Sequence, residues 1–220
     1  MAMVDLHLLA QTVVYCCTLI CGFFVSIPVG LTNKNFDGMC MLYGDFSLKS
    51  NHELMMKSSD HLNCNFSIYL NVLGSIFYSL FLLAYNAYAL HKSRSNGNVG
   101  FEMWVLPFIL LNAVMTIMIL VSSCIVTVGL NEFCSGITQS IFYSSCIDAQ
   151  NKEWINVNTG EMFNVGNFYE LLTVAKLASW VSFMLWIGQV ALGILRFFRN
   201  RAYRTRSSDR DRFSDINPSA

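Results

Sequence analysis

The chain has 220 residues, of which 54% are hydrophobic and only 13% are charged, whereas a soluble domain carries roughly 25% charged residues. Fourteen basic and fourteen acidic residues give a net charge of zero, which argues against the cationic surface of a nucleic-acid-binding protein. Most of the surface is therefore expected to meet a medium other than water, and the composition indicates an integral membrane protein.

Four apolar runs are long enough to cross a membrane as helices, and they cover about residues 8–31, 66–90, 104–130 and 171–198. Each meets the roughly 20 residues that an α-helix needs to cross a hydrocarbon core of about 30 Å. A signal peptide is the competing interpretation of the first run. Its apolar part is too long for one, however, and its flank carries Asp5 in place of Lys or Arg.

These runs predict an all-α membrane protein, a four-helix transmembrane bundle with two disulfide-containing exoplasmic loops. The transmembrane domain is expected over residues 1–200, with outer loops at about 32–65 and 131–170. The first outer loop has turn formers at 33–38 before an alternating apolar stretch at 41–43, so a short strand or hairpin is predicted there.

Basic residues near the helix ends set the predicted orientation. The short loop between the second and third runs carries Lys92 and Arg94, and the segment that follows the fourth run is rich in Arg. Lys and Arg are enriched in cytosolic flanks, so both segments are placed in the cytosol. An even number of spans returns the N-terminus to the cytosol as well. The predicted location is the plasma membrane or a membrane of the secretory pathway.

Four of the eight cysteines lie in the two outer loops, namely Cys40, Cys64, Cys134 and Cys146. The oxidising side of the membrane favours disulfides, and four cysteines allow three connectivities. The pairs Cys40–Cys64 and Cys134–Cys146 are favoured because each closes a short loop at low entropic cost. A pairing between the two loops is also compatible with the spacing.

Small and weakly polar residues recur at helical spacing in the second, third and fourth runs, and such stripes let helices pack closely. The residues are Asn71, Ser75, Ser79, Asn112, Thr116, Ser123, Thr127, Ala175, Ser179, Ser182, Gln189 and Gly193. The pattern predicts a packed bundle and indicates no chemistry.

Lys176 is the one ionisable residue well inside an apolar run. The residues between Lys176 and Arg196 cover about 29 Å at a rise of 1.5 Å per residue, close to the hydrocarbon thickness. Both cations are therefore predicted at membrane interfaces, with Lys176 on the same bulky face as Trp180. A working charge inside the bundle is the alternative, and pairing of its amine with an interior polar side chain would support it.

Residues 201–220 are rich in Arg, Ser and Asp and are predicted to form a disordered basic cytosolic tail. Its arginines are expected to lie against anionic headgroups. Ser207 and Ser208 are candidate phosphorylation sites, because added negative charge would weaken that attraction.

The ordered landmarks of the chain resemble the transmembrane protein 179 family. The matching features are "DGMCMLY", "CNFS", "IVTVGLNEFCSGIT", the "SC" at Cys146 and the Trp pair in "ASWVSFMLW". The first outer loop lacks the Trp of the claudin signature, and the second lacks the Cys-Cys-Gly of tetraspanins. The resemblance covers the chain to about Tyr203. It implies a multi-pass membrane topology and supplies no mechanism.

Catalytic motifs are absent from the sequence, which has no Gly-rich phosphate loop, nucleophile elbow or paired CxxC. No catalytic residue, cofactor or metal site is predicted, and the chain is not expected to be an enzyme. The predicted function is a non-enzymatic accessory or scaffolding subunit that binds another membrane protein through its outer loops and small-residue helix faces. A small transporter or channel is the alternative. The expected partners are the lipid bilayer and a membrane protein, without nucleic acid.

Overall fold

The computed structural model describes residues 6–48, 53–57, 59–93, 105–139, 145–150, 153–156, 160, 162–163 and 165–216. Four helical spans dominate it, and each is long and apolar enough to cross a membrane. They are α1 (Leu6–Asn35), the continuous helix of α2 (His61–Leu70), η1 (Asn71–Tyr78) and α3 (Ser79–Ser93), then α5 (Leu106–Gln139) and α7 (Phe168–Ile216). The predicted four-helix membrane fold is confirmed.

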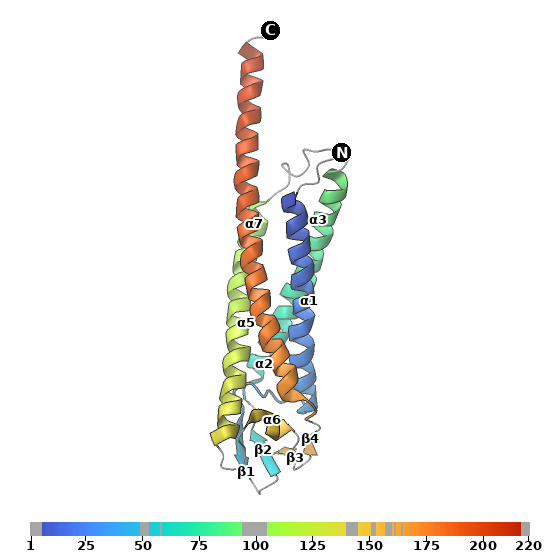
Figure 1. Cartoon of the computed structure of the whole chain (residues 1–220), viewed down its shortest axis with the longest axis vertical. Helices are drawn as coiled ribbons and strands as arrows, with labels where there is room; N and C mark the ends of the chain where they lie inside the picture. Colours follow the sequence, from blue (N-terminus) through green and yellow to red (C-terminus); the bar gives the residue numbers. More distant parts are fainter. Residues whose placement is uncertain are drawn as a thin grey trace.

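The helices form an elongated bundle with a small sheet at one end (Figure 1). Helix α1 packs along both α7 and α3, and α7 packs also along α5. The start of α1 and the end of α7 lie at the end opposite the sheet, where α7 extends far beyond the other helices (Figure 1). Both outer loops therefore meet at a single end of the molecule.

The two outer loops share a four-stranded sheet of order β1-β2-β3-β4. The first loop contributes an antiparallel hairpin of β1 (Asp45–Leu48) and β2 (Glu53–Lys57), and the second contributes antiparallel β3 (Glu153–Asn156) and β4 (Met162–Phe163). Strands β2 and β3 pair in parallel and join the loops. The predicted hairpin is present but follows residues 41–43. The second-loop strands and the parallel pairing were not predicted.

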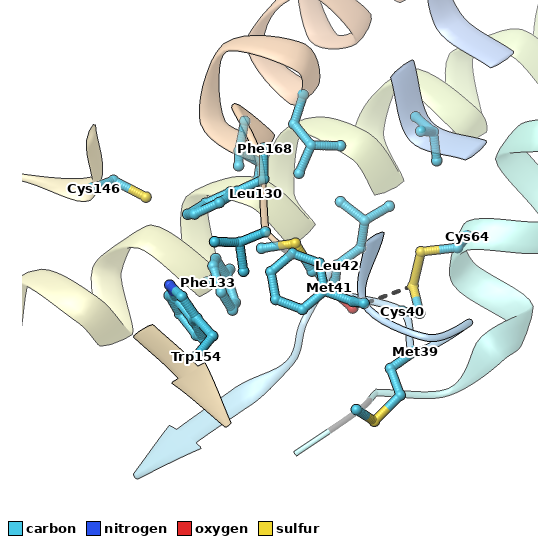
Figure 2. Packing of buried hydrophobic residues seen from close by; sticks show 14 of the residues in the cluster. Met39, Cys40, Met41, Leu42, Cys64, Leu130, Phe133, Cys146, Trp154 and Phe168 are labelled. Carbon is cyan, nitrogen blue, oxygen red and sulfur yellow. Dashed lines mark hydrogen bonds between the residues drawn. A yellow bond between two sulfur atoms is a disulfide. The ribbon is translucent and has the colours of Figure 1, made fainter. Parts of the chain in front are cut away.

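We call the sheet, the short helix α6 (Cys146–Gln150) and the segment of residues 36–44 the cap. Its hydrophobic core is continuous with the adjoining ends of the membrane helices (Figure 2). Members from the cap include Phe36, Leu42 and Trp154, and members from the helices include Leu130 and Leu172. The cap is thus packed onto the bundle and is not a separate domain.

Two helices run past their predicted ends. Helix α5 continues beyond residue 130 into the cap, where it carries Phe133 and Cys134. Helix α7 continues through Ile216, so residues 201–216 are helical where a disordered segment was predicted. Extending an existing helix needs no new nucleation, and the sequence after Gly193 has no Gly or Pro before Pro218. Arg and Asp at i, i+3 spacing, such as Arg206 and Asp209, also favour the helix.

The second span contains an irregular segment, the π-helical η1. It lies closely against α1, because a Cβ at Gly22 would be only 2.9 Å from the Cβ of Ser75. Glycine at position 22 is therefore required by this approach of the two helices. Longer π segments are rare and often occur where a helix carries function, so polar groups in this region are described below.

Candidate functional site

Both predicted local disulfides are present. Cys40 is bonded to Cys64 and Cys134 to Cys146, with sequence separations of 24 and 12 residues. Cys64 lies in the first turn of α2, and Cys134 lies in the last part of α5. Each bridge therefore fastens one outer loop to the end of a membrane helix. In the chain-entropy account, closing loops of this size stabilises the fold by about 3 kcal/mol per bridge.

Trp154 of β3 is the central side chain of the cap and is fully buried. Its ring stacks on Phe133 of α5 with centroids 5.7 Å apart, and it meets Phe36 and Phe168 edge-on at 5.9 and 5.8 Å. Figure 2 shows the indole beside Phe133. The indole Nε1 donates a hydrogen bond to the Ala149 carbonyl at 2.9 Å. One residue of the second loop thus contacts the ends of α5 and α7 and Phe36, the residue that follows α1.

The first loop reaches the bundle by crossing α5 at Gly129. The backbone N–H of Tyr43 donates to the Gly129 carbonyl at 3.3 Å. A Cβ at Gly129 would lie 2.8 Å from the Cβ of Leu42 and 3.2 Å from its Cα. Ser59 binds the backbone of residues 40–42, because its N–H donates to the Cys40 carbonyl at 3.2 Å and its hydroxyl donates to the Leu42 carbonyl. The absence of a side chain at position 129 therefore sets how closely the loop packs.

The cap leaves large apolar side chains exposed. Met162 of β4 is 65% exposed and Ile147 of α6 is 44% exposed. Leu62, in the first turn of α2, is also exposed. Apolar side chains outside the lipid-crossing part of a membrane protein are available to contact a partner protein.

Buried polar side chains connect the helices inside the bundle. In the half next to the cap, the Asn71 amide donates to the Ser67 carbonyl at 2.8 Å and to the Ser122 hydroxyl at 3.4 Å. Farther from the cap, the Tyr78 hydroxyl donates to Asn112 Oδ1 at 3.2 Å, and Asn112 Nδ2 donates to the Tyr15 hydroxyl at 2.8 Å. This second chain joins η1, α5 and α1.

Arg196 turns into the bundle and is only 4% exposed. Its Nη1 donates to Gln11 Oε1 of α1 at 3.1 Å, and Gln189 Nε2 donates to the Gln11 backbone carbonyl at 3.0 Å. The sequence patterns did not identify Gln11, although a lone Gln in an apolar run is a detectable signal. Neither did they identify Tyr15. The position of Arg196 at a membrane interface stays a prediction, while its inward direction is observed.

Lys176 lies in a seam between α7 and α5. Its Nζ donates to Asn131 Oδ1 at 3.3 Å, and one turn later Trp180 Nε1 donates to Thr127 Oγ1 at 3.0 Å. The side chain is half-buried, and Asn131 is exposed. The partner of the Lys176 amine is therefore not a polar side chain of the bundle interior. The contact favours a seam between two helices over an interior working charge, and the interface position stays a prediction.

The remaining candidates from the sequence are the two possible phosphorylation sites and the cysteines outside the disulfides. Ser207 and Ser208 lie on the extension of α7, and their phosphorylation stays a prediction. The remaining cysteines, Cys16, Cys17, Cys21 and Cys124, are free thiols within the membrane helices. In the part of the chain that the structure describes, no group of three or more His, Cys, Asp or Glu residues could hold a metal ion.

Two apolar grooves open on the sides of the bundle. One, of about 700 Å³, runs between the second span and α5 and is lined by residues that include Tyr69, Leu73 and Met115. The other, of about 490 Å³, lies between α1 and α7 and includes Phe24 and Val174. In a bilayer such grooves are filled by lipid chains or by another helix.

Residues 7–216 match the family model described as the Transmembrane protein 179/179B Claudin domain. Transmembrane protein 179B of Danio rerio is 28% identical over 205 residues, covering 92% of this chain and 89% of that protein. The Mus musculus protein of that name is 25% identical over 176 residues (80% and 76%), and the Homo sapiens protein is 24% identical over 187 residues (85% and 81%). No solved structure matches the chain.

The description of the matched domain corrects one inference from the sequence. A first loop without Trp separated the chain from the claudins, yet the matched domain is described as a claudin domain. The missing signature is therefore a difference within a claudin-like domain. In this chain the buried Trp of the cap comes from the second loop, as Trp154.

Proposed function

The chain belongs to the Transmembrane protein 179/179B claudin-domain family, and on this premise we propose that it is a non-enzymatic accessory or scaffolding subunit. It is a multi-pass membrane protein, so the lipid bilayer is one of its partners. The other is a second membrane protein that binds to the cap. The matched family is a claudin-like membrane family and not a known enzyme family.

Packing inside the bundle supports an accessory or scaffolding subunit over a transporter or channel. A transporter is expected to have a polar, water-filled cavity near the middle of the membrane. In the described part of the bundle, the polar cavity beside Tyr15 has a volume of about 20 Å³, which is room for about one water molecule. A cavity of that size does not hold a hydrated solute.

The small-residue stripes of the helices are occupied within the chain. Most of their members are buried, including Ser75, Ser123, Ser179 and Ser182. These faces hold the helices of one bundle together and are not available to a partner. The part of the sequence-based hypothesis that placed a partner on these faces is therefore withdrawn, and the partner is assigned to the cap.

The observation that carries the proposal is the exposed apolar surface of a cap that is covalently and hydrophobically fixed. Ile147 and Met162 are exposed on two elements of the second loop. The Cys134–Cys146 disulfide holds α6, and β4 pairs with the strand that carries the buried Trp154. A surface that is ordered before binding loses little conformational entropy when a partner binds, which suits a constitutive subunit contact.

Affinity purification in mild detergent tests the proposal. The tagged native chain should recover a membrane protein in a fixed ratio, and the double variant Ile147→Glu, Met162→Glu should lose it. Gln139→Glu is the matched control, because it adds a charge at an exposed position near the cap and removes no apolar surface. Repeated recovery of the lone native chain, or a partner retained equally by the double variant, would contradict a cap-bound subunit.

The proposed topology places both termini in the cytosol and the cap on the exoplasmic side, at the plasma membrane or in the secretory pathway. Two independent features support it. Basic residues gather at the end of the bundle opposite the cap, as cytosolic flanks do. The two disulfides lie at the cap end, as expected on the oxidising side of such a membrane.

A further inference from the structure

The groove between α1 and α7 lies in the half of the bundle next to the cap, where α1 ends and α7 begins (Figure 1). Its apolar walls are formed by Phe23, Phe24 and Ile27 of α1 and by Leu171 and Val174 of α7. Its volume of about 490 Å³ is within the range of sites that hold a small molecule. The groove is therefore large enough for one hydrocarbon chain.

The depth of the groove matches one leaflet of a bilayer. The rings of Phe36 and Phe168 have centroids 6.0 Å apart, so the end of α1 and the start of α7 lie at the same level beside the cap. From Lys34 down to Phe23, helix α1 covers about 16 Å at a rise of 1.5 Å per residue. Half of a hydrocarbon core is about 15 Å, whereas a transmembrane helix contacts a surface about 30 Å long. The groove thus matches a lipid of the leaflet beside the cap and not a membrane helix.

Two polar side chains lie at the cap end of the groove. Asn167 directly precedes α7 and Glu170 is in its first turn, and both are exposed. The Asn167 Nδ2 donates to Glu170 Oε2 at 3.2 Å, which orients the carboxylate. Neither Glu170 Oε1 nor Asn167 Oδ1 accepts a hydrogen bond from a residue that the structure describes. Two acceptor oxygens, one of them on a charged group, are therefore available at this end.

Lys34 brings a positive charge to the same end of the groove. It lies in the last turn of α1, seven residues after Ile27, and seven residues are nearly two turns, so both side chains are on one face of the helix. The next residue, Asn35, approaches the turn before α7, because a Cβ at Gly166 would be 3.2 Å from Asn35 Nδ2. Lys34 and Glu170, both within the described chain, form no ion pair with each other. This end thus presents one charge of each sign.

These groups discriminate among phospholipid headgroups. A primary ammonium has three N–H donors and can bond both free acceptor oxygens at Glu170 and Asn167. A quaternary ammonium has no N–H and is usually held by aromatic faces, and the wall residues Phe23 and Phe24 lie at the opposite, deep end. An anionic headgroup is attracted by Lys34 but repelled by Glu170. A phosphate followed by a primary ammonium complements both charges.

We propose that this groove binds a phospholipid with a phosphatidylethanolamine headgroup, in the leaflet beside the cap. One acyl chain lies along Ile27, Leu171 and Val174, the ammonium group donates to Glu170 and Asn167, and the phosphate lies toward Lys34. Such a lipid fills the gap between the first and the last helix of the bundle, so it stabilises their packing. The site does not depend on the proposed protein partner, which is assigned to the cap.

Lipid titration of the purified full chain in detergent tests this proposal, with native mass spectrometry and melting temperature as readouts. The lipids are dioleoyl phosphatidylethanolamine, phosphatidylcholine and phosphatidylglycerol, which share their acyl chains and differ in headgroup. The native chain should retain one phosphatidylethanolamine with about three- to fivefold higher apparent affinity than phosphatidylcholine, the effect of one exposed charged contact. Its melting temperature should rise with that lipid. Val174→Trp fills the groove and should weaken the retention of phosphatidylethanolamine by at least about fivefold.

Glu170→Gln removes the charge at nearly constant shape and should reduce the affinity for phosphatidylethanolamine to that for phosphatidylcholine. The matched control is Glu132→Gln, the same change at an exposed acidic residue of α5 outside the groove, and it should keep the preference. Equal losses in the two variants would overturn the proposal, because they would show a general effect of charge.

Three results from the native chain would also overturn the proposal. Equal retention of the three lipids would show ordinary boundary lipid in the groove. A preference for phosphatidylglycerol would show that Lys34 alone attracts the headgroup. A dimer that retains no lipid, and that Val174→Trp dissociates, would show that a second copy of the chain occupies the groove.

Discussion

Replacing Trp154 with Ala removes the side chain that contacts the ends of α5 and α7 and the residue that follows α1. The lost ring contacts Phe36, Phe133 and Phe168 and is fully buried, and truncations of buried aromatic residues of this kind cost about 3–5 kcal/mol. For a chain of this length, 1 kcal/mol corresponds to a shift in Tm of roughly 2–4 °C. We therefore expect the Trp154→Ala variant to melt about 6–20 °C below the native chain.

The same position offers a graded test. Trp154→Phe keeps an aromatic ring but loses the hydrogen bond to the Ala149 carbonyl, so a smaller loss of about 1–3 kcal/mol is expected. Phe81→Ala is the matched control, because Phe81 is 59% exposed on a membrane helix and its truncation should change stability by less than about 0.5 kcal/mol. Size-exclusion profiles of heated, detergent-solubilised samples give the three melting temperatures. If the Trp154→Ala variant has the same melting temperature as the Phe81→Ala control, the hydrophobic core of the cap does not hold the helix ends together.

Three further predictions concern packing, topology and the tail. Gly129→Ala should lower stability by about 1 kcal/mol, because overpacking against the Leu42 backbone exceeds the gain in helix propensity. Gly188→Ala, which has open space at its Cβ, should leave the melting temperature unchanged or raise it, and equal losses would refute the packing argument. On intact cells with protein at the surface, a membrane-impermeant maleimide should label Thr138→Cys and not Lys92→Cys, two exposed positions at opposite ends of the bundle. The reverse labelling pattern would show that the chain has the opposite orientation in the membrane. Replacing Ser207 and Ser208 with Glu should weaken the binding of the C-terminal segment to anionic vesicles by about fivefold or more. Replacement of both with Ala is the control. Unchanged binding of the Glu variant would exclude an electrostatic attraction of this segment to the headgroups.

Features that depend on local sequence were predicted well. The four spans follow from hydrophobic runs whose length matches the bilayer, which is a property of each run by itself. The disulfide pairs Cys40–Cys64 and Cys134–Cys146 follow from short loop closure, which also needs no information from elsewhere in the chain. The interior stripes, such as Ser75 and Ser79, follow from helical periodicity alone.

The candidate sites were predicted less completely. Lys176 drew notice because charge is rare in apolar runs, yet its amine contacts Asn131 at a seam between helices. Arg196 was treated as a marker of the membrane boundary, and its inward contact with Gln11 depends on how α1 and α7 pack. A polar residue in an apolar run can be seen in the sequence, but its partner on another helix cannot.

The sequence by itself determined the number and the chain order of the membrane helices and favoured the local disulfides, because each of these is encoded within one short segment. Only the tertiary structure decided that β2 and β3 pair in parallel, that Trp154 occupies the centre of the cap, and that Ile27 and Glu170 line a common groove. These features join segments far apart in the chain. Their free energy comes from burial and hydrogen bonding between those segments, so no local pattern records them.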